Sequence, residues 1–463
     1  MTVILSGSTA LLRRVRCRTP PIGVATSILA TTPRRSRCPA TLSFSTVVAS
    51  MPTADSLTDS AASAAAATAV RRPIYVAATK QHTGKTSVSL ALISGLQKRF
   101  ATVGFCKPVG QQSVVVSDDN KSWIRVDKDA ALIKDHFGLD HLTYQQTSPV
   151  MIPPGYTRDY VDGKITSRQQ RDTIETAYAA VEKVSDVVLC EGTGHCAVGS
   201  IVNASNAAVA SWVDGRIVLV ANGGLGKSFD ELELNRVLCQ QHGVEIAGVI
   251  VNMVKPEKYD QTKHYLTKAL KDRWDVPLLG CVPDRPFLGC PALSDLERLF
   301  EGSCLVTGQD HRLRHYQVQD LYLVATSLEV FLKSLRLNPP RTLYVCHSSR
   351  NDILLGFLME AQNRGAGWEA ALVVTGCEEH PISTQTLEIV TSLPRQQSQP
   401  PVLVTPHPMR QAMESIHNYT PKLNFEDGHR VNVAVDHYEP YINFDLLLER
   451  VGFKDVPAAT VAV

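Results

Sequence analysis

The chain of 463 residues lacks several features that mark whole classes of protein. It contains no run of 18 apolar residues, which excludes a membrane-spanning helix. Its 11 cysteines are scattered singly, with no C-x-x-C pair, so neither a disulfide framework nor a zinc site is expected. Hydrophobic residues make up 44% of the chain and charged residues 20%, which indicates a folded globular protein.

Acidic residues are missing from positions 1–54, which hold seven arginines and no lysine. An apolar arc of Ile4, Leu11, Leu12 and Val15 accompanies them, a composition typical of an organelle transit peptide. We expect a mitochondrial protein, with a plastid as the alternative, and a transit peptide and linker over 1–70. The remainder carries 40 basic and 45 acidic residues, a balance that predicts no binding to nucleic acid or to a membrane surface.

From residue 73 onward, short apolar runs alternate with helical patterns. Continuous apolar runs are typical of strands buried on both faces of a parallel sheet, so the pattern predicts a doubly wound α/β fold. The sequence around Ser228 and Glu231 resembles a capping box that would begin a helix. Strands are expected at 73–78, 103–106, 186–190, 216–221, 246–252 and 276–282, with a helix at about 85–98.

A second α/β block follows a cluster of proline and glycine near 283–291. Its expected strands are 342–346, 371–375 and 401–405, and its expected helices lie near 350–363, 384–392 and 408–417. We therefore predict two folded domains, 71–285 and 286–463.

The segment 78–86, ATKQHTGKT, follows the first strand and opens the first helix, which is the setting of a phosphate-binding P-loop. Gly84 lets the backbone approach a phosphate, Lys85 reaches the β- and γ-oxygens, and the Thr86 hydroxyl is placed to bind Mg²⁺. Thr79 replaces the usual first glycine, and Lys80 stands where deviant P-loops carry a second lysine. The predicted nucleotide-binding residues of the loop are Thr79, Lys80, Gln81, His82, Thr83, Gly84, Lys85 and Thr86.

The segment IYVAATKQHTGKTSVSLALISGLQKRFATVGFCKPVGQ resembles the start of dethiobiotin synthetases and of the amino-terminal module of long bacterial phosphate acetyltransferases. Later segments agree in order, including VVLCEGTG, IVLVA, AGVIVN and LLGCVP. The resemblance covers about 73–285 and implies a P-loop domain that binds ATP and Mg²⁺.

The same resemblance assigns roles to four further positions. It implies that Lys107, in the segment K-P-V, faces the phosphates and the substrate, so that Lys85, Lys107 and Lys80 are the expected catalytic lysines. It implies a metal site of Thr86, Asp129 and Glu191, with Asp127 as the alternative to Asp129. Asn252 matches the asparagine that reads the adenine base.

Residues 286–430 resemble the DRTGG domain that follows this module in the acetyltransferases, on the segments CHSSRND at 346–352 and VTG at 374–376. We expect no acetyltransferase catalytic domain. The resemblance implies ATP-dependent activation of a small carboxylate or amine substrate. The alternative is a nucleotide sensor that hydrolyses ATP weakly or not at all. The position of Lys80 and the pairing of the synthetases predict a homodimer.

Overall fold

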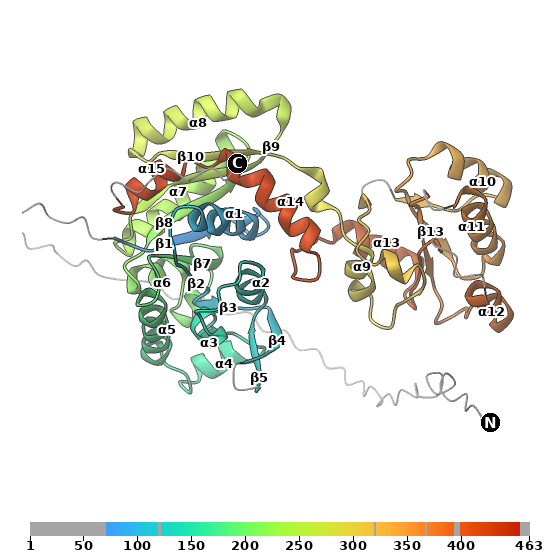
Figure 1. Cartoon of the computed structure of the whole chain (residues 1–463), viewed down its shortest axis with the longest axis horizontal. Helices are drawn as coiled ribbons and strands as arrows, with labels where there is room; N and C mark the ends of the chain where they lie inside the picture. Colours follow the sequence, from blue (N-terminus) through green and yellow to red (C-terminus); the bar gives the residue numbers. More distant parts are fainter. Residues whose placement is uncertain (1–70, 119–121, 319–320, 366–367, 393–398, 454–463) are drawn as a thin grey trace, which may run out of the picture. The chain divides into compact units, whose positions relative to one another are not determined.

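The computed structural model describes residues 71–118, 122–318, 321–365, 368–392 and 399–453 (Figure 1). The expected transit peptide and linker over 1–70 lie outside these residues. Among the described residues, no helix is long and apolar enough to span a bilayer.

A six-stranded parallel sheet forms the first core, in the order β10-β9-β8-β1-β7-β2. Its strands are nearly continuous runs of β-branched and small apolar residues, which suits burial on both faces. Because all the strands are parallel, their carboxyl ends lie at one edge of the sheet. The bounds are β1 Ile74–Ala78, β2 Val103–Cys106, β7 Val187–His195, β8 Arg216–Asn222, β9 Ile246–Val254 and β10 Leu278–Pro283.

Helices cover both faces of this sheet. Helix α1 (Lys85–Gln97) connects β1 to β2 in one direction along the sheet, whereas the connections through α5 (Ser167–Glu182), α7 (Gly226–Gln241) and α8 (Tyr259–Trp274) run in the other direction. Right-handed crossovers therefore put α1 on one face and the other three helices on the opposite face.

The excursion between β2 and β7 carries a small antiparallel ribbon of β4 (Ser113–Ser117) and β5 (Trp123–Asp127), which leads into helix α2 (Lys128–His136). Asp127 is the N-cap of α2 and accepts a hydrogen bond from the backbone N–H of Asp129 at 2.9 Å. The same excursion holds β3 (Val109–Gly110), α3 (Tyr144–Thr147), β6 (Val150–Met151) and α4 (Tyr156–Val161), and the short α6 (Asn206–Trp212) follows β7.

The C-terminal helices α14 (Gly428–Tyr438) and α15 (Phe444–Arg450) pack in the first core, although the second sheet precedes them in the chain. Helix α14 lies against α1 (Figure 1). The ring of Phe444 fills the space beside Gly95, where an added Cβ would stand 2.0 Å from Cζ of that ring. Ile442 pairs with Gly280 and so covers the exposed edge of β10. These helices lie within the predicted second domain, 286–463, and their packing in the first core was not predicted.

The second sheet has the order β11-β15-β14-β13-β12, with β11 antiparallel to its neighbour. One face packs on α10 (Leu328–Leu337), α11 (Asn351–Arg364) and α12 (Thr384–Ser392), and the other on α9 (Leu293–Leu299) and α13 (Met409–Asn418). Its strands are β11 Cys304–Thr307, β12 Tyr322–Leu323, β13 Leu343–His347, β14 Ala371–Thr375 and β15 Val402–Val404.

The expected fold class is confirmed, and the expected strands appear within a few residues of their predicted bounds. The predicted capping box at 228–231 is wrong. Helix α7 begins at Gly226, and the buried Ser228 donates a hydrogen bond from its hydroxyl to the carbonyl of Asn222 at 2.7 Å. The serine ties the helix to the end of β8, which a local sequence pattern does not reveal.

Candidate functional site

The loop between β1 and α1 has the shape that a phosphate-binding loop requires. Gly84 has a φ of 79° and precedes the first helical residue, Lys85. A side chain at Gly84 would also collide with Asn252, whose Nδ2 lies 2.2 Å from the position of an added Cβ. Glycine is therefore needed here both for its backbone conformation and for space. The loop opens a helix of 13 residues, whose N-terminal N–H groups favour an anion.

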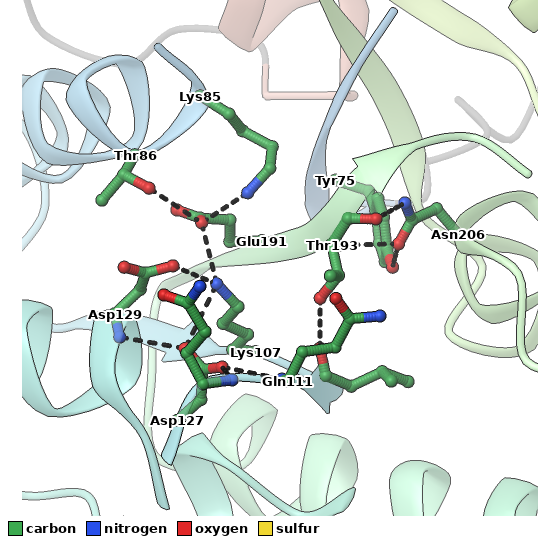
Figure 2. Close-up of polar contacts among 12 residues, drawn as sticks. Tyr75, Lys85, Thr86, Lys107, Gln111, Asp127, Asp129, Glu191, Thr193 and Asn206 are labelled. Carbon is green, nitrogen blue, oxygen red and sulfur yellow. Dashed lines mark hydrogen bonds and ion pairs between the residues drawn. The ribbon is translucent and has the colours of Figure 1, made fainter. Parts of the chain in front are cut away.

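Glu191, in β7 beside the loop, connects the P-loop to the rest of the site. Its Oε1 accepts a hydrogen bond from Lys85 Nζ at 2.6 Å and lies 3.4 Å from the Thr86 hydroxyl (Figure 2). The side chain is fully buried, and its second oxygen, Oε2, has no hydrogen-bond partner. A buried carboxylate oxygen without a partner is costly, so this atom is available to a cation or to a donor from a ligand.

Lys107, which follows β2, lies among three carboxylates (Figure 2). Its Nζ contacts Asp129 Oδ2, and it lies 3.2 Å from Asp127 Oδ1 and 3.2 Å from Glu191 Oε1. The side chain of Lys107 is only 4% exposed. Three elements far apart in the sequence thus place one ammonium group and three acids next to the P-loop.

Lys85 and Lys107 differ in their electrostatic surroundings. Burial lowers the pKa of Lys85, and the attraction of Glu191 opposes that shift without overcoming it. Burial also acts to lower the pKa of Lys107, but Asp129, Glu191 and Asp127 together raise it well above its usual range. Lys107 therefore stays charged, because three carboxylates surround it where Lys85 has one close partner.

Two acids of the site, Asp129 and Glu191, are held in their ionised form. Burial tends to raise the pKa of Asp129, but Lys107, Lys128 and Lys85 lower it overall. Burial likewise tends to raise the pKa of Glu191, and Lys85 and Lys107 lower it. At neutral pH the site thus holds charged groups of both signs, with donors that can neutralise a phosphate.

The residues predicted for a metal fit Mg²⁺ in their chemistry. Thr86 Oγ1, Asp129 and the partnerless Oε2 of Glu191 are the hard oxygen donors that this ion prefers. Asp127 differs from Asp129, since its carboxylate accepts hydrogen bonds from the backbone of Asp129, Gln111 and Gln112. No cluster of three His, Cys, Asp or Glu residues arranged to hold a metal occurs within the described ranges. Mg²⁺ in nucleotide sites usually completes its coordination with phosphate oxygens and water.

Lys80 and Asn252, both predicted to contact the nucleotide, bond to other groups of the protein. Lys80 Nζ lies 3.2 Å from Glu231 of α7, and the Lys80 side chain is 38% exposed. Asn252 is fully buried and donates to the carbonyl of Thr83 at 2.7 Å, while its Oδ1 accepts from the N–H of Met253. Asn252 therefore holds the P-loop to the end of β9. Gln81 and His82 are exposed at the tip of the loop.

A cavity of about 780 Å³ contains most of these groups. Its walls include the P-loop, Lys107, Asp127 and Asp129, the segment 284–290 after β10, and Tyr438. A larger hollow, of about 890 Å³, lies between α5, α6 and α7, and none of the predicted site residues lines it. The buried charges point to the smaller cavity as the site, because perturbed ionisable groups cluster at functional sites.

The sequence of this region matches a family model described as "AAA domain" over residues 72–292. A P-loop domain of the AAA type occupies this part of the chain. The candidate site in this domain has a polar centre formed by Lys85, Thr86, Lys107, Asp129 and Glu191.

Curated relatives extend this finding. A phosphate acetyltransferase from Synechocystis is 22% identical over 387 residues, which cover 81% of this chain and 51% of the relative. One from Nitrosomonas europaea is 24% identical and covers 82% of this chain and 51% of the relative. An ATP-dependent dethiobiotin synthetase from Methanococcus vannielii is 23% identical and covers 46% of this chain and 93% of the relative. The chain thus spans about half the length of the acetyltransferases that it matches.

Among solved structures, the MinC:MinD cell division complex from Aquifex aeolicus covers 47% of this chain, with 14% identity and a TM-score of 0.28. The expected relation to dethiobiotin synthetases and to phosphate acetyltransferases is confirmed by the relatives. The likeness of the second block to a DRTGG domain stays a prediction.

Sequence reasoning missed several residues around the P-loop domain's site. Asn206 accepts hydrogen bonds from Tyr75 and from the N–H of Thr193, and it donates to the carbonyl of Thr193, so it fixes the end of β7 after Glu191 (Figure 2). Tyr438 of α14 reaches the P-loop from the far end of the chain. No spacing or motif signals either residue, because their contacts are made across long stretches of sequence.

Proposed function

We propose that this protein binds Mg-ATP at residues 79–86 and uses it to activate a small carboxylate or amine substrate. The observation that carries the proposal is the position of Lys107, a charged and buried lysine beside the P-loop. Catalysis of phosphoryl transfer consists mainly of positioning and of neutralising charge on the transferred group. Lys85 and Lys107 are the donors available for that purpose, and binding of a phosphate would relieve their shared contact with Glu191 Oε1.

Magnesium fits this proposal through Thr86, Asp129 and Glu191. When bound, the ion would supply positive charge at the β- and γ-phosphates. Asp127 acts on the backbone instead, since it caps α2 and thereby orients Asp129 toward Lys107. We expect Asp127→Asn to weaken nucleotide binding less than Asp129→Asn does.

The first test is calorimetry of Mg-ATP with the wild-type protein and with Lys85→Ala. We expect the variant to lose at least about 100-fold in affinity, since a charged hydrogen bond and the attraction to two phosphates disappear together. The circular dichroism spectrum should not change, because Glu191 keeps Lys107 as a partner. Equal affinities for the two proteins would contradict the assignment of the site.

The alternative function, a nucleotide sensor without appreciable turnover, makes a different prediction. Single-turnover hydrolysis of ATP should be measured alone and with a panel of diamines and small carboxylic acids. An increase in rate with one compound supports the activating enzyme. Slow hydrolysis that no compound accelerates, combined with tight ATP binding, supports the sensor.

We further propose a homodimer in mitochondria. Lys80 supports the dimer, because its pairing with Glu231 at the surface leaves it able to turn toward its own phosphates or toward a second subunit. Mixing Lys80→Ala subunits with Lys85→Ala subunits separates these cases, provided that the Lys80→Ala protein alone is impaired. Recovered activity in the mixture indicates action across the interface. A monomer by light scattering with ATP present would contradict the dimer.

The mitochondrial location has its own test, which is amino-terminal sequencing of the protein from isolated mitochondria.

A further inference from the structure

The last turn of helix α14 lies next to the P-loop, although the second sheet separates the two in the chain. Tyr438 ends this helix, is 4% exposed, and lines the same cavity as Lys85 and Lys107. The next residue, Glu439, anchors the turn to α1 by accepting a hydrogen bond from the Ser94 hydroxyl at 2.7 Å and by pairing with Lys98. The turn that carries Tyr438 is therefore tied to α1.

The phenol of Tyr438 points at the start of α1. Its oxygen lies 3.2 Å from the position that a Cβ on Gly84 would take. Burial raises the pKa of Tyr438, and hydrogen bonds with Asn252 and Ser87 offset that shift only in part. The phenol is thus neutral at physiological pH and able to donate or accept a hydrogen bond.

The strand order places Tyr438 at a definite end of the site. Glu191 is in β7, on one side of β1, whereas Asn252 is at the end of β9, on the other side of β1. Lys85 and Thr86 face Glu191, so the terminal phosphate belongs on the β7 side. The rest of a nucleotide must then extend toward β9, where Tyr438 meets Asn252.

We propose that Tyr438 is a binding residue for the ribose of a nucleoside triphosphate. The lining of the same cavity includes Met253, Pro286 and Leu288, apolar side chains that suit a purine or pyrimidine ring. Asn252 is a positioning residue in this arrangement, because its amide is already bonded to Thr83 and Met253. The inference rests on the proposed function, since it presumes that the P-loop holds a nucleotide.

The test compares three ligands, Mg-ATP, Mg-ADP and inorganic tripolyphosphate, by calorimetry on the full chain. Tyr438→Phe keeps the ring and removes only the hydroxyl. We expect it to weaken ATP and ADP by the same factor, roughly three- to tenfold, which corresponds to one hydrogen bond. Tripolyphosphate lacks the ribose, so its affinity should not change.

Tyr441→Phe is the matched control. Tyr441 lies three residues further on, also loses a phenol hydroxyl, and is 37% exposed, but it does not line the cavity. This variant should bind all three ligands as the wild type does. Both variants should keep the thermal midpoint of the wild type within about 2 °C, the shift expected for a small change in stability.

Three results would overturn the inference. Unchanged ATP affinity in Tyr438→Phe would show that the phenol does not contact the nucleotide. An equal loss of tripolyphosphate binding would show that it acts by shaping the P-loop. If Tyr438→Phe does not fold, hydrogen exchange on the wild type replaces it. ATP should then protect residues 428–441, and tripolyphosphate should not. Equal protection by the two ligands would contradict the proposal. A wild type that binds no ATP at all refutes the proposed function itself, which distinguishes the two failures.

Discussion

In both sheets of this protein, polar side chains gather where the parallel strands end. The two sheets differ in which side chains these are. At the carboxyl edge of the first sheet, Lys107, Asp129 and Glu191 meet in a buried ionic cluster next to a P-loop. At the carboxyl edge of the second, His347 bonds to the exposed Ser349 at 2.8 Å and Thr405 bonds to His407 at 3.1 Å. A parallel sheet with helices brings strand ends together in both cases.

The difference shows that sheet topology decides where strand ends gather, whereas buried charged groups decide whether that place can bind a ligand. The polar groups named at the second edge hydrogen-bond to one another. At the first edge, Glu191 Oε2 has no partner, and two lysines compete for Glu191 Oε1. Burying charged groups costs free energy of desolvation, and such groups cluster at functional sites. This supports assigning the site to the first sheet.

The largest expected effect is that of Lys107→Met. The substitution keeps the length of the side chain and removes the ammonium group from among three carboxylates. We expect the free energy of unfolding at pH 7 to fall by about 3–5 kcal/mol, because the buried Asp127 and the partly buried Asp129 are left without their cation. Urea denaturation measures the change.

Lys134→Met is the control for that variant. Lys134 is also buried, but its Nζ donates to a neutral acceptor, the carbonyl of Leu139, at 3.2 Å. Its loss should cost only about 1 kcal/mol. If both variants lost the same stability, loss of any buried lysine would explain the result for Lys107→Met. The ionic cluster would then no longer distinguish the first sheet from the second.

Acid should destabilise the first edge. Asp129 and Glu191 have folded-state pKa values below their ordinary values of 3.8 and 4.5. Their ionisation therefore contributes stability above the unfolded pKa, and that contribution is lost as the pH falls below about 4.5 toward the folded pKa. Urea titrations should show little change in the free energy of unfolding between pH 7 and 5 and a clear drop at pH 3.5.

Lys107→Met sharpens this prediction. Without the ammonium group, burial of Asp129 loses its main opposing charge and the pKa of Asp129 rises, so the acid-induced drop should shrink. The same pH dependence in the variant and in the wild type would mean that other carboxylates cause the acid response.

Lys80→Ala should have a small effect on stability. The pair of Lys80 and Glu231 is partly exposed, with side chains 38% and 19% accessible. Such pairs contribute at most about 1 kcal/mol, and salt screens them. Thermal unfolding at low and high salt measures the contribution, and a loss of more than about 2 kcal/mol would contradict it.

Ser349→Ala should have the smallest effect. The serine is exposed at the start of α11, so we expect stability within about 0.5 kcal/mol of the wild type. Nucleotide affinity should not change. A clear loss of ATP binding in this variant would show that the second sheet also carries a phosphate site.

The sequence predicted most of the strands and the P-loop because their signals are local. An apolar run of five to seven residues indicates a buried strand, and G-K-T between a strand and a helix indicates a phosphate loop. It failed at Ser228, where the hydroxyl bonds to the preceding strand end rather than capping the helix. The assignment of Asn252 to the adenine base stays a prediction, with its amide bonded to Thr83 and Met253.

By itself, the sequence determined where strands, helices and the phosphate loop lie, since each depends on neighbours within a few residues. The tertiary structure decided which charges meet: Lys107 and Glu191 are 84 residues apart in the chain and 3.2 Å apart in space. It also decided that α14 and α15 return to the first core and bring Tyr438 to the P-loop. The reason is physical, because burial and ion pairing depend on groups that only the packing of distant segments brings together.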